Sequence, residues 1–269
     1  MGSSLFLINA DGSNWQKSQT IQTPSDVAKN IALLIQTQQP DIVIETEIGS
    51  QNIQTKTEKF LGNQYSVVAE RFWHNNDRIA IWVKNAANSF EFVHKKNGQA
   101  ITSFSKFGKY FSVTCKHSKE KWLIVAVHLP HKADREIAYD ALETFIRNIH
   151  HTVHHVIIAG DFNMSPEDIN AILCVPGSAL GHFTPILDSN TLSTTNKGGI
   201  RDNVLISKDL LRREWKCHVL SRYNKLTHKP IIASQKKTQT KPRSISPGQK
   251  KVRSGAKKSR SVSPRPKKK

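Results

Sequence analysis

The sequence predicts a mixed α/β or α+β domain followed by a basic tail that has no core of its own. Many short apolar or alternating runs, typical of β-strands, are separated by a few stretches with helical periodicity. Residues 232–269 contain ten Lys, four Arg and no Asp or Glu, so they carry +14 of the net charge of +19. Because so polar a segment cannot bury a core, we expect a domain at residues 1–234 and a disordered tail at 235–269.

The first half of the domain begins with a strand at residues 4–9 (SLFLIN). Residues 24–40 predict a helix with Ser25 as its N-cap and Pro40 as its end. The apolar residues of this helix share one face: Val27, Ile31, Leu34 and Ile35. Five strands are expected next, a short buried one at 41–47 (DIVIETE) and antiparallel ones at 65–71, 78–84, 89–94 and 109–115.

The second half combines an apolar strand at residues 122–130 (WLIVAVHLP) with a helix from about Ala133 to Ile149. The expected apolar stripe of this helix is Ile137, Ala141, Leu142, Phe145 and Ile149. The remaining strands are expected at 156–163 (VIIAGDFN), 201–207 (RDNVLIS), 216–221 (KCHVLS) and 229–234 (KPIIAS).

Polar side chains stand where these apolar strands end. Asp161 and Asn163 follow VIIA, and because residues i and i+2 face the same side of a strand, both can project into one space. Carboxylate and amide oxygens are ligands that suit Mg²⁺ or Mn²⁺, and nearby histidines can act as acid and base at a phosphoryl centre. The set therefore indicates phosphoester hydrolysis; its other members are Asn9, Glu47, His128, Asp202 and His228.

In this order, the motifs resemble the endonuclease/exonuclease/phosphatase superfamily, the deoxyribonuclease I-like proteins. Residues 160–163 match the GDFN signature in full, and PDIVIETE at 40–47 resembles P-D-x-x-x-x-Q-E, with Thr46 in place of the usual glutamine. Further motifs resembling the family's are VAVHLP, IRDNVLIS and LTHKP. The resemblance covers about residues 4–234 and implies a four-layer sandwich, two packed, mostly antiparallel sheets flanked by helices.

The resemblance also implies a role for each site residue. Glu47, with Asn9 and Asp161 near it, would hold Mg²⁺ or Mn²⁺. His228 would activate the attacking water, and Asp202 would orient the imidazole of His228. His128 would stabilise or protonate the leaving group, and Asn163 would position a phosphate oxygen.

Two further positions carry expectations from the resemblance. Asp77, in NNDRIAIWV at 75–83, resembles the acidic residue that supports the first histidine in the deoxyribonuclease branch. Thr227 stands where family members usually carry Asp before the final histidine. Since threonine holds no charge, we expect His228 to be less well supported and the enzyme to be slow.

The resemblance and the ligand chemistry together predict a metal-dependent phosphodiesterase that cuts DNA internally. One alternative is a phosphoinositide or sphingomyelin phosphodiesterase, although no apolar insertion hairpin for a lipid surface is visible in the sequence. The other alternative is a catalytically weakened nucleic-acid-binding protein, for which Thr227 is the relevant feature.

The tail favours nucleic acid as the partner and the nucleus, or else the cytoplasm, as the location. Its two related segments, RSISP at 243–247 and RSVSP at 260–264, place Ser246 and Ser263 before proline. We expect a monomer with no signal peptide, no membrane span and no disulfide framework, since the three cysteines are sparse and the chain lacks an 18-residue apolar run.

Two other groups of residues carry weaker signals. The histidines at 150, 151, 154 and 155 have a spacing that can bind zinc, but a solvated helix end and loop is the preferred interpretation. Trp15, Trp73 and Trp82 are expected in core or rim packing rather than stacked on a substrate.

Overall fold

The protein is described by a computed structural model that divides into two compact units, residues 1–238 and 239–269. The second unit lies outside the described residues. The prediction of a disordered tail concerns this same part of the chain. The described residues are 4–9, 23–72, 78–85, 90–91, 104–115, 119–131, 134–187, 193–195, 199–220 and 228–235.

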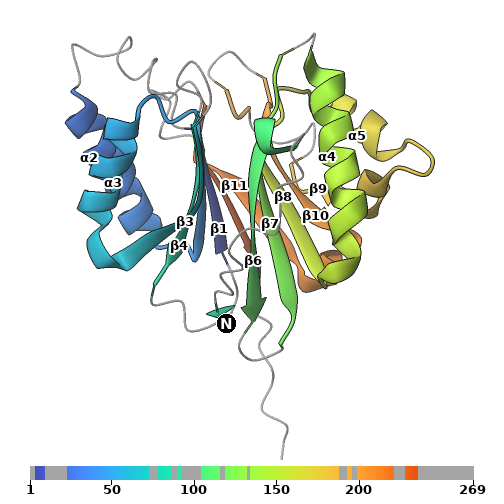
Figure 1. Ribbon diagram of the computed structural model, residues 1–269, viewed down its shortest axis with the longest axis horizontal. Helices are drawn as coiled ribbons and strands as arrows, with labels where there is room; N and C mark the ends of the chain where they lie inside the picture. The colour runs from blue at the N-terminus through green and yellow to red at the C-terminus, as the bar shows by residue number, and fades with distance from the viewer. Residues whose placement is uncertain are drawn as a thin grey trace, which may run out of the picture. The chain divides into compact units, whose positions relative to one another are not determined.

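Two six-stranded sheets form the centre of the first unit (Figure 1). The strand orders are β11-β12-β1-β2-β4-β3 and β5-β6-β7-β8-β10-β9. The pairs β1–β2 and β7–β8 are parallel, and the other neighbouring pairs are antiparallel. The strands are β1 (Ser4–Asn9), β2 (Ile42–Thr46), β3 (Tyr65–Phe72), β4 (Arg78–Lys84), β5 (Phe90–Glu91), β6 (Gly108–Cys115), β7 (Lys121–His128), β8 (His155–Asp161), β9 (Phe183–Pro185), β10 (Asp202–Ser207), β11 (Trp215–Val219) and β12 (Ile231–Gln235).

The sheets pack face to face, and helices cover their outer faces, which confirms the four-layer sandwich (Figure 1). The inner layer joins Ile44 and Ile81 of the first sheet to Ile124 and Val204 of the second in one buried cluster. Two further apolar clusters attach the helices to the sheets. Helices α2 (Pro24–Gln38) and α3 (Gln51–Leu61) cover the first sheet, and α4 (Arg135–Ile149) and α5 (Pro166–Leu173) cover the second.

Helix α2 begins at Pro24, two residues before the start implied by Ser25 as the N-cap. Its N-cap is Thr23 rather than Ser25, and Thr23 forms a capping box with Asp26. The physical reason is Pro24, which lacks an N–H and has a φ that suits the first helical position, so the residue before it becomes the cap. The apolar face of α2 is buried as predicted.

Helices α3 and α5 and the short strand β9 were missed. Helix α3 (QNIQTKTEKFL) has few apolar residues, and its only strong sequence signal is the N-cap Ser50. Helix α5 has a capping box between Ser165 and Asp168 with a proline at its start, a pattern readable in the sequence. In α4 the stripe includes Ala138 instead of Ile137, whose exposed fraction is 62%.

The histidine segment differs in part from the prediction of a solvated end. His150, His151 and His154 are exposed, but His155 opens β8 and is buried. Its ring packs edge-on against Trp122 and bonds to Asp209. His155 is therefore a structural residue.

Trp82 is fully buried, as predicted for core packing, and its indole N–H donates to Glu45 at 2.8 Å. Trp15 and Trp73 lie outside the described residues. Among the residues that the structure describes, no helix has the length and apolar character needed to cross a membrane.

Candidate active site

Three strand ends in the second sheet bring polar side chains into one row. In the register of the sheet, Asp161 of β8 is paired with His128 of the parallel strand β7 and with Asp202 of the antiparallel strand β10. The end of β7, the end of β8 and the start of β10 therefore meet at one edge. The sequence predicted this convergence from the polar residues at strand ends.

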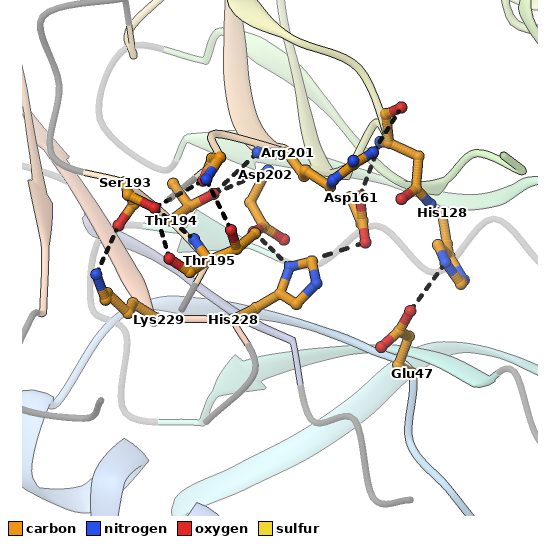
Figure 2. A network of polar contacts seen from close by, with 12 residues as sticks. Glu47, His128, Asp161, Ser193, Thr194, Thr195, Arg201, Asp202, His228 and Lys229 are labelled. Carbon is orange, nitrogen blue, oxygen red and sulfur yellow. Dashed lines mark hydrogen bonds and ion pairs between the residues drawn. The ribbon is translucent and has the colours of Figure 1, made fainter. Parts of the chain in front are cut away.

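Glu47 adds a carboxylate from the first sheet. It follows β2 with a φ of 53°, a left-handed conformation that is costly and uncommon for a residue other than glycine. Its Oε1 lies 3.2 Å from Nε2 of His128. The site therefore spans both sheets, with Glu47 facing the row on the second sheet (Figure 2).

The GDFN motif has a geometric explanation at each of its polar positions. A Cβ on Gly160 would lie 1.9 Å from the carbonyl oxygen of Val127, so only glycine lets β8 pass so close to β7. Asp161 Oδ1 accepts a hydrogen bond from the backbone N–H of Asn163 at 2.8 Å. The side-chain amide of Asn163 donates to the carbonyl of Leu129 at 2.7 Å. Asp161 and Asn163 are thus rigidly held and almost fully buried.

His228 and Asp202 form a buried pair. Nδ1 of His228 lies 2.7 Å from Oδ2 of Asp202 and 3.9 Å from Oδ2 of Asp161. With the Nδ1 proton donated to Asp202, Nε2 is the ring atom that can accept or release a proton. Figure 2 shows this second nitrogen turned toward the side where Glu47 and His128 lie.

Burial and the crowding of charge shift the pKa values of this site. Burial, followed by the charge of Asp202, raises the pKa of Asp161 to about 7. Burial alone would lower the pKa of His228, but the hydrogen bond and charge of Asp202, with the charges of Asp161 and Glu47, outweigh it and raise the pKa to about 9. Before any cation binds, the site therefore favours bound protons.

A segment that the sequence analysis missed connects the two halves of the buried pair (Figure 2). The hydroxyl oxygen of Thr194 accepts from the backbone N–H of Arg201 at 2.9 Å and of Asp202 at 3.4 Å. The carbonyl of Thr194 accepts from the N–H of Lys229 at 2.6 Å. Thr194 thereby ties the start of β10 to the segment that carries His228. Its sequence context, LSTTNK, gives only a turn signal.

The donor atoms fit a divalent cation. Ligand atoms of Glu47, His128 and Asp161 all lie within 4.8 Å of one another, and the same holds for Asp161, Asp202 and His228. Oδ1 of Asp202 is buried and has no hydrogen-bond partner among the described residues. Carboxylate oxygens suit Mg²⁺ and Mn²⁺, so the residues present are compatible with either ion.

The structure places six predicted residues together at this edge: Glu47, His128, Asp161, Asn163, Asp202 and His228. The backbone of Asn9 ends β1 beside Thr46, one residue before Glu47, while the side chain of Asn9 lies outside the described set. Asp77 and Thr227 also lie outside the described residues.

A comparison with protein-family models identifies the family of this chain. The family model described as "Endonuclease/Exonuclease/phosphatase family" matches residues 9–224. A comparison with curated protein sequences gives no significant match.

Three solved structures illustrate the shared fold. A humanized D. rerio TDP2 aligns with a TM-score of 0.61 at 14% identity over 87% of this chain and 98% of that chain. The human nocturnin catalytic domain with bound sulfate aligns with a TM-score of 0.61 at 17% identity over 87% and 93%. A Bacteroides thetaiotaomicron protein of the family gives 0.60 at 14% identity over 87% and 97%. With the family match spanning most of the domain, the chain belongs to the endonuclease/exonuclease/phosphatase family.

Proposed function

We propose that this protein is a divalent-metal-dependent phosphodiesterase that cuts DNA internally, as deoxyribonuclease I-like enzymes do. Members of the family are typically metal-dependent phosphodiesterases and nucleases. The observation that carries the proposal for this chain is the buried His228–Asp202 pair beside the Glu47–His128–Asp161 set. This arrangement supplies a proton-transfer group and a cation site at one edge.

Each residue has a chemical task in this proposal. Asp202 holds the Nδ1 proton of His228, so that Nε2 can take a proton from the attacking water. His128 lies opposite, against Glu47, where an imidazolium can protonate the leaving oxygen. Asn163 fixes the loop after β8 through Leu129 and has a second amide hydrogen for a phosphate oxygen.

Glu47 and Asp161 would hold Mg²⁺ or Mn²⁺, with Asn9 as a further oxygen donor from β1. A divalent cation in such a site supplies charge stabilisation for a phosphoryl group as negative charge develops. The two carboxylates are held from different sheets, so the geometry of the cation site depends on the packing of both.

DNA is the favoured substrate because of charge. The tail carries +14, and the rest of the chain is left with +5 of the net +19. Positive charge of this kind attracts phosphate backbones through counterion release. One D. rerio TDP2 structure is described as complexed with a single-strand DNA product, a statement about that protein that is compatible with this proposal. The tail also suggests nuclear accumulation.

The test is nicking of supercoiled plasmid with Mg²⁺ or Mn²⁺, with and without EDTA, beside the variant Asp161→Ala. We expect metal-dependent nicking that EDTA and the variant abolish. Cleavage of phosphoinositide in vesicles without plasmid nicking would instead favour the lipid alternative. DNA binding without cleavage of either substrate would favour the weakened binding protein.

A further inference from the structure

Two arginines converge on one carbonyl at the rim of the site. Nη2 of Arg135, at the start of α4, donates to the carbonyl oxygen of Asn163 at 3.1 Å. Nη1 of Arg201, just before β10, donates to the same oxygen at 3.4 Å. Asn163 is the residue whose backbone N–H is bonded to Asp161, so both guanidinium groups lie beside the cation site.

The two lone pairs of this carbonyl oxygen can accept from both arginines, but bringing two like charges onto one oxygen is unfavourable in itself. The carboxylate nearest to Arg135 is Asp168, whose Oδ2 lies 3.9 Å from Nη1 and whose side chain is 57% exposed, so its compensation is weak. The positive charge of Arg201 also acts on the neighbouring His131. Its pKa is lowered by burial and then by the charges of Arg201 and His128.

The backbone of Arg201 is fixed at two points although its side chain is exposed. Its N–H donates to the hydroxyl of Thr194 at 2.9 Å, and its carbonyl accepts from the N–H of Phe162 at 3.0 Å. A guanidinium whose backbone is held in this way is suited to bidentate binding of a phosphate.

We propose that Arg135 and Arg201 form a second anion subsite, which binds the phosphate neighbouring the scissile one in the same strand. This inference rests on the proposed function and narrows its substrate class: the site would favour a chain of phosphodiesters over an isolated diester. The two arginines are then specificity-determining residues, since neither is among the groups assigned to the chemical step.

The test measures binding rather than turnover, so that it is independent of whether the enzyme is active. The probes are a thymidine dinucleotide with a methylene in place of the scissile oxygen, and the same compound with an added 5′- or 3′-phosphate. Binding is measured by calorimetry with Mg²⁺. For wild type we expect one of the two phosphorylated probes to bind about tenfold more tightly than the parent, the scale of a charge-assisted contact.

The variants identify the source of this gain. Arg201→Gln should lose most of it, while Arg201→Lys should keep part of it, because lysine retains the charge but not the planar fork. Arg212→Gln is the matched control, an exposed arginine in the 3-10 helix η7 (Lys208–Arg213) after the far end of β10, and should keep the full gain. A wild type that gains nothing from either phosphate, or an Arg201→Gln variant with the full gain, would overturn the subsite. Neither result depends on plasmid nicking, which tests the proposed function separately.

Discussion

A buried histidine lies among carboxylates beside each end of the second sheet, and the two ends differ in the charged groups gathered there. At one end, His155 lies between Asp209 and Glu120, with Glu120 Oε1 3.2 Å from Nε2. Arg213 donates to the same Glu120 oxygen at 2.5 Å and stacks over Trp122 at 5.3 Å from the ring centroid. Two carboxylates thus face an arginine and a histidine.

At the other end, three carboxylates, Glu47, Asp161 and Asp202, gather with His128 and His228. With neutral histidines this set has a formal charge of −3, whereas Glu120, Asp209 and Arg213 together have −1. A divalent cation would offset part of the negative charge of Glu47, Asp161 and Asp202. The comparison teaches that histidine and carboxylate proximity is not enough to identify a site; the two ends differ in how many carboxylates gather around the histidines.

The largest expected effect is on the rate of hydrolysis, and it should differ between the two ends of the second sheet. Glu47→Gln keeps the shape of the side chain but removes a charge that we assign to cation binding, so hydrolysis should fall at least about 10²-fold. Glu120→Gln is its counterpart at the end that carries His155. It should lower stability while leaving turnover within about twofold of wild type. Steady-state rates at saturating Mg²⁺ check both. If Glu47→Gln and Glu120→Gln lost the same amount of hydrolytic activity, the two ends of the sheet would not differ in function.

The next effect concerns pH. The pKa of His228 in the folded, cation-free protein is about 9, above the ordinary 6.5, so this histidine contributes stability that is fully present below pH 6.5 and is lost as the pH rises through 9. Asp202→Asn removes the hydrogen bond to a charged partner that contributes most to raising the pKa of His228. The fall in unfolding free energy between pH 6 and pH 9 should therefore shrink by about 2 kcal/mol in the variant, as urea denaturation in EDTA can measure. An unchanged slope would show that Asp202 does not hold the proton.

A smaller effect is expected at Thr227, which precedes His228. A carboxylate there would strengthen the support of the imidazolium, because charge-assisted bonds are about twice as strong as neutral ones. Thr227→Asp should raise turnover of DNA by about tenfold, or about 1.4 kcal/mol. Thr227→Asn controls for size without charge. If wild type is fast and Thr227→Asp slows it, the assignment of His228 as base is wrong.

The smallest effect on the site should come from the tail. Since β12 ends at Gln235, truncation after that residue leaves the sheet intact. We expect weaker DNA binding and a shallower dependence on salt, with hydrolysis of a small diester nearly unchanged. Phosphate at Ser246 and Ser263 should act in the same direction, by subtracting charge. Identical salt slopes for the full chain and the truncation would reject the nucleic-acid arm.

The strands were predictable because their apolar alternation is local, and so were the polar residues that end them. Helix α3 was not, because it is polar and only its neighbours in the fold stabilise it. The role of Thr194 was also hidden, since its hydrogen bonds join segments that are far apart in the sequence. Likewise, Arg201 is identified only by the carbonyl that it shares with Arg135.

The most direct test of the proposed cation site is titration of Mg²⁺ into the protein by calorimetry at pH 8, in two buffers with different heats of ionisation. Cation binding between Glu47 and Asp161 offsets charges that raise the pKa of His228, so part of a proton should be released per ion bound. Asp161→Asn should lose both the Mg²⁺ binding and the proton release, and Asp209→Asn, at the end that carries His155, should keep both. Undiminished Mg²⁺ binding in Asp161→Asn, or none in wild type, would contradict the account.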